Sequence, residues 1–279
     1  MSGDSVPPMR VTVVSDTHLS ARTPEAGTNW AAVVHYVAET QPDLVVHLGD
    51  LTCAGSDDPA ELAGGRLLLD QLSVPWRAIP GNHDIGDNLG NGTPPEGTVE
   101  PSRLAAWRDA IGADWWSLEV GGWKLVAINA QLFGSGLDDE AAQWSWLDAE
   151  LERTQDTIFL SHKPIAADDA ELRVSPGHRF VPDPGRTRLR RMLSADDLVV
   201  SGHVHQSRAL DIEGQRHVWA PTAWAAVPDA IQALIPGASK RCGIVDIVLP
   251  AAGLPTTQVV EPPGLVQHTA GQDIPSPYA

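Results

Sequence analysis

Cysteine, positive charge and long hydrophobic runs are all scarce in this sequence. Its two cysteines, Cys53 and Cys242, cannot form a disulfide framework, and neither belongs to a Cys-x-x-Cys metal pair. We expect both to be buried free thiols. No apolar run approaches the length that crosses a bilayer, and residues 1–10 contain no signal-peptide core. These absences predict a soluble cytoplasmic protein without a membrane partner.

The shortage of positive charge limits the class of partner. Lysine and arginine total 19 against 36 aspartate and glutamate residues, which gives a formal net charge of −17. Such a charge repels polyanions, so extended nucleic acid is a poor partner. A small phosphorylated substrate is compatible with it, because two bound divalent ions would reverse the local field. With 279 residues and 42% hydrophobic content, the chain can bury a full core.

What the sequence does contain is a set of apolar runs that each end in metal-ligand residue types. The runs are residues 11–14, 44–48, 74–79, 158–161 and 198–201, followed by Asp16-Thr17-His18, Gly49-Asp50, Gly81-Asn82-His83-Asp84, His162 and Gly202-His203-Val204-His205. In open α/β sheets, ligands bind beyond the carboxyl ends of the strands. We therefore expect these residues to meet at one edge of an α/β fold.

Spacing within two of these groups favours a shared ion. Asp16 and His18 lie two residues apart on an extended segment, so their side chains point to the same side. The same holds for His203 and His205, and histidines in this arrangement make a good metal pair. His47 precedes Gly49 within a strand, and we interpret it as a packed core histidine.

The group at residues 81–84 combines four kinds of chemistry. Gly81 allows a sharp turn, and Asn82 offers a neutral oxygen to a cation. His83 can transfer a proton near neutral pH, and Asp84 can orient that histidine. The alternative for Asp84 is a turn carboxylate that accepts hydrogen bonds from local backbone amides.

Helical spacing of apolar residues predicts helices between these strands. The predicted helices are residues 29–40, 60–72, 102–111, 138–153 and 186–193, and the further predicted strands are a hairpin of 115–120 and 123–129, then 218–220 and 243–249. The first helix lies between two predicted strands, which indicates a βαβ unit.

Three irregular segments are candidates for substrate or partner contacts. Residues 85–101 leave the 81–84 group directly and are a candidate lid. Residues 163–184 follow His162 and are expected to form another wall of the site. Within them, Lys163 and Arg179 are either phosphate contacts or solvated surface charges. Residues 224–235 are predicted to be a short helix or a partner surface, where the contact of a possible homodimer would lie.

The ordered set from Asp16 to His205 resembles the motif blocks of the calcineurin-like metallophosphoesterase superfamily. The resemblance extends most closely to the calcineurin-like phosphoesterase-domain-containing protein phosphatases and to class III cyclic-nucleotide phosphodiesterases. Ile85 and Gly86 stand where the second group often has an arginine, which weakens a cyclic-nucleotide assignment. The resemblance implies an α/β fold, a four-layer αββα sandwich with two mixed β-sheets. We expect a catalytic domain at residues 9–250 and a Pro- and Gly-rich tail at 251–279.

The same resemblance implies the roles of the site residues. One metal ion is expected on Asp16, His18, Asp50 and His205, and a second on Asp50, Asn82, His162 and His203. Asp50 would bridge the two ions through its two oxygens. His83 would be the catalytic acid, with Asp84 holding its ring. Nitrogen and oxygen ligands without thiolate suit Mn, Fe or Zn ions, of which the resemblance favours Mn or Fe.

These roles imply a dinuclear-metal hydrolase of small phosphate esters. Its nucleophile would be a metal-bound hydroxide, and phosphodiesters and phosphomonoesters are both open as substrates. One alternative is an enzyme like the serine/threonine protein phosphatases. Another, from a different class, is a non-catalytic interaction module on the same fold, which broken ligand blocks would indicate.

Overall fold

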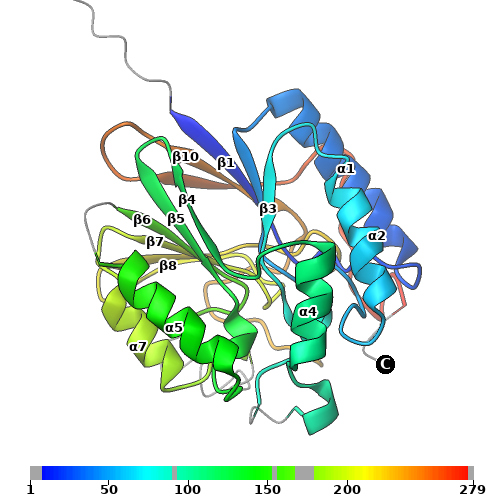
Figure 1. The fold of residues 1–279 in the computed structure, drawn as a ribbon. Helices are drawn as coiled ribbons and strands as arrows, with labels where there is room; N and C mark the ends of the chain where they lie inside the picture. The colour runs from blue at the N-terminus through cyan, green and yellow to red at the C-terminus, as the bar shows by residue number, and fades with distance from the viewer. Residues whose placement is uncertain (1–7, 90–92, 153–155, 167–178, 276–279) are drawn as a thin grey trace, which may run out of the picture.

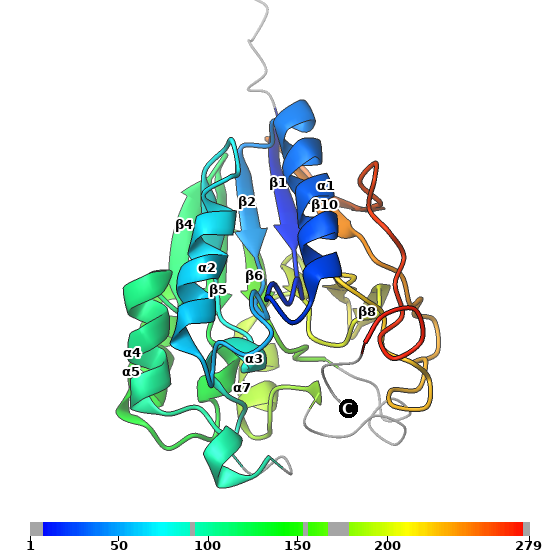
Figure 2. The same ribbon diagram turned by 90° about the vertical axis from the view of Figure 1, so that its right-hand side faces the viewer.

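The computed structural model describes residues 8–89, 93–152, 156–166 and 179–275. Within these ranges the chain folds into two β-sheets with helices outside them (Figure 1, Figure 2). The strands are β1 (Met9–Val14), β2 (Leu44–His47), β3 (Trp76–Ala78), β4 (Trp116–Val120), β5 (Trp123–Ile128), β6 (Thr157–Ser161), β7 (Leu198–Ser201), β8 (Arg208–Ile212), β9 (Gln215–Trp219), β10 (Ile244–Leu249) and β11 (Thr256–Val260). The helices are α1 (Pro24–Thr40), α2 (Pro59–Leu69), α3 (Asn82–Ile85), α4 (Pro101–Ala110), α5 (Asp138–Glu150) and α7 (Gly185–Met192), with short 3-10 turns η1 (Pro95–Gly97) and η2 (Ala130–Leu132).

Both sheets are mixed. The first has the order β11-β10-β1-β2-β3, in which β1, β2 and β3 are parallel and β10 and β11 add antiparallel pairs. The second has the order β4-β5-β6-β7-β9-β8, with a parallel centre from β5 to β9 and antiparallel strands at both edges. The carboxyl ends of the parallel strands therefore collect at one edge of each sheet.

Alternation along the strands explains why the sheets stack. In β6, Ile158 and Leu160 pack into a cluster shared with β1 and β2 of the first sheet. Phe159, which points the other way, packs with Leu147 of α5 and Leu189 of α7. Successive strand residues face opposite sides, so both faces of each sheet are buried. The layers run from α1 and α2 through two sheets to α5 and α7 (Figure 1), which confirms the predicted αββα sandwich.

The largest difference between the predicted and the observed helix bounds is at the start of α1. The first helix begins at Pro24 and not at residue 29. Proline suits the first helical turn because that turn has no intrahelical acceptor for its backbone N–H groups. Pro59 and Pro101 occupy the same position in α2 and α4, so these three prolines mark helix starts.

The chain after β10 packs back onto the first sheet and α1. Residues 256–260 form β11 against β10. The buried side chain of Asn29 in α1 donates to the carbonyls of Trp224 and Val266 and accepts from the Val266 amide. The division of the chain at residue 250 stays a prediction.

Two further predictions about local structure have definite outcomes. Cys53 and Cys242 are buried and free, as expected. Residues 224–235 do not form a helix, because Trp224 to Val227 are buried in the core as an irregular segment.

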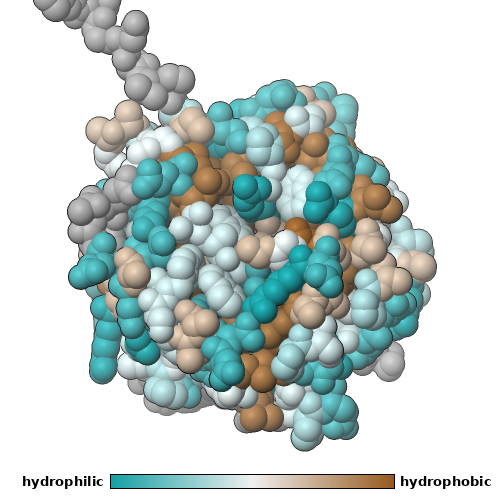
Figure 3. All heavy atoms as spheres, in the orientation of Figure 1, coloured by the Kyte–Doolittle hydropathy of each residue, from teal (hydrophilic) through white to brown (hydrophobic). Residues whose placement is uncertain are grey.

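No helix within the described ranges is long and apolar enough to cross a bilayer. The face shown in Figure 3 is mostly hydrophilic, with smaller hydrophobic patches between the polar side chains.

Candidate metal centre

All seven predicted ligands lie at strand ends where the two sheets meet. Asp16 and His18 follow β1, Asp50 follows β2, and Asn82 begins α3 after β3. His162 follows β6, and His203 and His205 follow β7 in the other sheet. A backbone hydrogen bond from Gly202 to the carbonyl of His162 joins the last two strand ends. The site is therefore assembled from both sheets.

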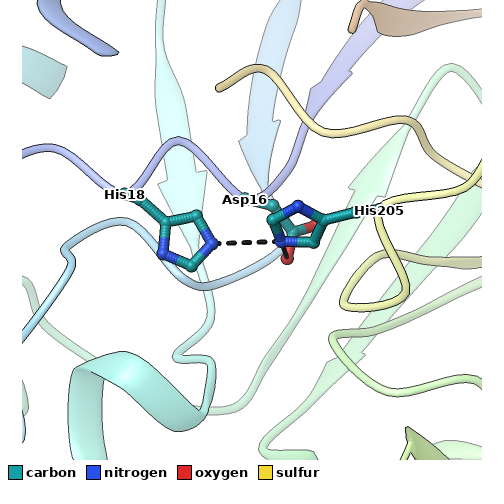
Figure 4. Close-up of side chains that lie close together, drawn as sticks. All are labelled: Asp16, His18 and His205. Atoms are coloured by element: carbon teal, nitrogen blue, oxygen red, sulfur yellow. Dashed lines mark hydrogen bonds and ion pairs between the residues drawn. The ribbon is translucent and has the colours of Figure 1, made fainter. Parts of the chain in front are cut away.

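The first group of ligand atoms comes from Asp16, His18 and His205 (Figure 4). Nε2 of His205 lies 3.3 Å from Oδ1 of Asp16 and 3.1 Å from Nε2 of His18. All three side chains are buried. Donor atoms this close, on side chains from different sheets, form one candidate metal position.

The second group comes from Asp50, His162 and His203, with Asn82 beside it. Nε2 of His162 lies 3.4 Å from Oδ2 of Asp50 and 3.3 Å from Oδ1 of Asn82. The rings of His162 and His203 are 4.9 Å apart. Nε2 of His203 is buried and has no hydrogen-bond partner among the described residues. A buried imidazole nitrogen without a hydrogen-bond partner, on a histidine grouped with Asp50 and His162, fits the role of a metal ligand.

Asp50 connects the two groups. Its Oδ2 atom lies 3.8 Å from Nε2 of His18 and 3.4 Å from Nε2 of His162. Its Oδ1 atom accepts a hydrogen bond of 2.9 Å from the backbone N–H of His83. The sequence prediction gave one oxygen to each ion. The structure instead places the same oxygen, Oδ2, nearest to both groups, because Oδ1 is held by the backbone.

Backbone carbonyls set the tautomers of three histidines. Nδ1 of His162 lies 2.9 Å from the Leu48 carbonyl, and Nδ1 of His205 lies 2.7 Å from the Ala225 carbonyl. A carbonyl only accepts, so each Nδ1 carries a proton and Nε2 is the nitrogen that faces the site. His83 has the same arrangement, with Nδ1 2.8 Å from the Cys53 carbonyl.

His47 shows the opposite arrangement. Its Nδ1 accepts from the backbone N–H of Gly49 at 3.2 Å, so Nε2 carries the proton and donates to the Thr17 hydroxyl at 2.9 Å. The ring is fully buried. The prediction of a packed core histidine is confirmed, and His47 supports the strand end from behind.

The ligand positions are marked by unusual backbone geometry. Seven described residues other than glycine have positive φ, and five of them are predicted ligands: Asp16, His18, Asp50, His203 and His205. Residues other than glycine rarely adopt this left-handed backbone conformation, and those that do concentrate at functional sites. The tight reversals point consecutive strand ends inward.

Two motif glycines permit the strand ends to approach each other. A Cβ atom on Gly81 would collide with the side chain and backbone of Asp50, and one on Gly202 would collide with the Ser15 hydroxyl. No larger residue fits at either position without moving these neighbouring atoms. The glycines in these motifs are therefore required by close packing.

The charges around the site keep the Asp50 carboxyl group ionised. Burial acts to raise the pKa of the Asp50 carboxyl, but His162 and His83 outweigh it and hold that pKa well below its ordinary value. Burial acts to lower the pKa of His162, yet Asp50 outweighs it and raises that pKa to about 9. Burial and the neighbouring His83 hold the pKa of His18 well below its ordinary value. Ionised carboxylates beside buried imidazoles form a donor set that fits two borderline metal ions.

The structure corrects the predicted role of Asp84. Its carboxylate accepts hydrogen bonds from the backbone of Leu51, Thr52 and Gly81 and from the Thr52 hydroxyl. The contact that orients His83 is the Cys53 carbonyl. Asp84 therefore acts as the alternative described it, a buried carboxylate that ties the 81–84 turn to the segment after Asp50.

Lys163 is not the solvated charge that the sequence allowed. It is fully buried, and its Nζ donates to Oδ1 of Asp87 and, at 2.8 Å, to Oδ1 of Asn88. Arg179 is also buried and donates to the Ile231 carbonyl at 3.1 Å. The rest of the predicted 163–184 wall includes residues 167–178, which lie outside the described residues.

The buried pair of Lys163 and Asp87 gives a stability prediction. Replacing Asp87 with alanine is expected to lower the free energy of unfolding by about 3 to 5 kcal/mol, because a buried ammonium group loses its carboxylate. Chemical denaturation followed by circular dichroism measures the change. Asp148→Ala is the control, since its pair with Arg188 is exposed and contributes about 0 to 1 kcal/mol. Equal losses in the two variants would show that burial of the pair is unimportant.

Sequence reasoning missed the segment that backs the first group. The Trp224 ring lies 4.9 Å from the His18 ring, and its indole N–H donates to Glu25 at 3.0 Å. Thr222 donates to the Asp16 carbonyl at 2.9 Å. The apolar composition of residues 224–235 was the available signal, but it does not identify a partner for the metal ligands.

The described part of the candidate lid, residues 85–101, is held by hydrogen bonds. The guanidinium group of Arg103 donates to the carbonyls of Ser56, Glu96 and Thr98. Residues 90–92 of this loop lie outside the described residues. The loop therefore forms a wall beside His83, and opening of this wall stays a prediction.

The sequence and the fold of this chain are similar to those of known phosphoesterases. A family model described as calcineurin-like phosphoesterase matches residues 9–207. A probable glycerophosphodiester phosphodiesterase GpdQ of Arcobacter nitrofigilis is 26% identical over 225 residues, covering 71% of this chain and 72% of the relative. The 3',5'-cyclic adenosine monophosphate phosphodiesterase CpdA of Escherichia coli K12 is 24% identical over 229 residues, covering 77% and 76%.

A solved structure extends the likeness of the fold. The purple acid phosphatase PPD1 of yellow lupin superposes with a TM-score of 0.64 at 15% identity, covering 98% of this chain and 56% of that one. This identity shows a common fold only. The family match spans most of the chain and includes every strand end that carries a predicted ligand. The chain belongs to the calcineurin-like phosphoesterase family.

Proposed function

We propose that this metal-dependent phosphoesterase holds two metal ions and hydrolyses small phosphodiesters. One ion would bind Asp16, His18, Asp50 and His205, and the other Asp50, Asn82, His162 and His203. The observation that carries the proposal is the position of Oδ2 of Asp50 between Nε2 of His18 and Nε2 of His162. A single anionic oxygen between two imidazole groups suits a shared ligand for two cations.

A side chain of the protein would supply the proton that the leaving group takes up. When bound, two metal ions neutralise phosphoryl oxygens and make water nucleophilic near neutral pH. His83 stands at the edge of this centre, with its ring 4.8 Å from the His18 ring. Its Nδ1–H is held by the Cys53 carbonyl, so Nε2 is the atom that can deliver a proton to the departing alkoxide.

The two curated relatives support diesters as the first substrates to test. Both are named as phosphodiesterases, one for glycerophosphodiesters and one for cyclic adenosine monophosphate. Identities of 26% and 24% leave the leaving group open, because a small number of residue changes is enough to alter a substrate pocket. No described ligand block is broken, which argues against a non-catalytic module.

The test uses the whole chain after metal stripping. We expect Mn²⁺ to restore hydrolysis of bis-aryl phosphates, with lower rates on mono-aryl phosphates and phosphopeptides. Higher turnover of phosphopeptides would select a protein phosphatase instead. Full activity of the stripped protein, verified metal-free by mass spectrometry, would disprove the metal-dependent mechanism.

A further inference from the structure

A cavity of about 570 Å³ lies next to the proposed acid. Asn82 and His83 line it, together with polar residues that include Arg22 and Ser56. A group that protonates the leaving oxygen must lie on the side from which that oxygen departs. If His83 is the acid, the leaving group would therefore enter this cavity, and the lining would decide which alcohols are accepted.

The charged side chains that line this cavity differ in whether they have a partner of opposite charge. Its two carboxylates already have cationic partners, since Asp57 lies 3.3 Å from Nη2 of Arg103 and Asp87 contacts Lys163. Arg22 also lines the cavity, and it is exposed. None of the ion pairs among the described residues includes the Arg22 guanidinium group. The cation available to a ligand here is Arg22, in a chain of net charge −17.

Arg22 is also close to the segment that holds the acid. Burial and the Glu61 carboxylate raise the pKa of the Cys53 thiol to about 11, and the charge of Arg22 opposes that rise. The carbonyl of the same Cys53 accepts the hydrogen bond from His83. Arg22 is thus placed on the leaving-group side of the proposed centre.

The residues that line the cavity also argue against a leaving group that contains a nucleobase. Apart from His83, the described lining holds no aromatic ring, and its apolar members are small ones such as Cys53, Ala54 and Pro275. Proteins that bind nucleobases commonly stack them on aromatic side chains. This lining suits a compact polar group.

We propose that Arg22 is a specificity-determining residue that recognises an anionic group on the leaving alcohol. The preferred substrates are then phosphodiesters whose leaving alcohol is small and carries a carboxylate or a second phosphate group. A guanidinium group pairs with both through paired N–H donors. This inference rests on the proposed function and names its substrate class.

The experiment compares three methyl aryl phosphodiesters on the Mn²⁺-loaded chain. They are methyl 4-nitrophenyl phosphate and its analogues with a 3-carboxylate or a 3-phosphonate on the nitrophenyl ring. In each, water adds to phosphorus, the P–O(aryl) bond breaks and the nitrophenolate leaves. Rates are divided by the uncatalysed rates to remove differences in leaving-group reactivity.

We expect kcat/KM for at least one anionic analogue to exceed that of the neutral diester by about tenfold. Arg22→Gln is expected to lower this ratio about tenfold. The control is Arg77→Gln, which removes the same charge from an exposed arginine in β3, and the ratio should keep its wild-type value. The analogue that loses the preference identifies the anion as carboxylate or phosphate-like.

Two outcomes would overturn the inference. A wild-type ratio of one or less would show that the cavity does not attract anions. An unchanged ratio in Arg22→Gln, which equal losses on all three diesters would give, would show that Arg22 does not recognise the leaving group. Hydrolysis of the neutral diester in any of these cases keeps the proposed function intact, whereas no hydrolysis of any diester rejects both.

Discussion

Replacing Asp50 with asparagine is expected to lower kcat/KM by at least about 10³ and to reduce bound metal to less than one ion per chain. The reason is that the two oxygens of Asp50 make different contacts. An asparagine can keep the Oδ1 contact with the His83 amide, so the fold of the turn is preserved. Its amide nitrogen would replace Oδ2, the atom between His18 and His162, and an amide N–H cannot bind a cation.

Metal content after dialysis, measured by mass spectrometry alongside turnover, tests this prediction. Asp246→Asn is the matched control, because Asp246 is a partly buried carboxylate of the same sheet with hydrogen bonds from Thr12 and Tyr36. It should retain the wild-type metal content. Two retained ions in Asp50→Asn would remove the bridging assignment, whatever the activity of the variant.

Replacing His83 with alanine should lower turnover by about 10² to 10⁴ on diesters with poor leaving groups. The loss should be much smaller for an activated aryl diester, whose leaving group departs without a proton. Metal content should not change, because the contact with Asp50 uses the backbone N–H of residue 83, which alanine keeps. The effect is therefore specific to the imidazole.

A plot of log kcat against leaving-group pKa measures this difference, and its slope should be steeper for His83→Ala than for wild type. The control is His35→Ala, which removes an exposed histidine of α1 that pairs with Glu39 far from the site. Its slope should match wild type. If His83→Ala slows all leaving groups equally, the residue positions substrate and does not act as the acid.

Much of the fold and the location of the site followed from local patterns. Apolar runs such as residues 158–161 predicted strands because a strand buried on both faces needs apolar residues on both. The ligands could be placed together because each follows such a run, and parallel strands end at one edge of a sheet. The start of α1 was predicted less well, since Pro24 precedes the periodic pattern that indicated this helix.

What the amino-acid order determined is which groups meet, namely two carboxylates, an amide and four imidazoles at the strand ends, together with His83. Tertiary structure decided how they meet: that Oδ2 of Asp50 lies near both His18 and His162, that Cys53 and not Asp84 orients His83, and that Lys163 is buried on Asp87. These contacts join segments 30 residues or more apart in the chain. A hydrogen bond of this kind depends on the distance and direction between two packed segments, and no local periodicity carries that information.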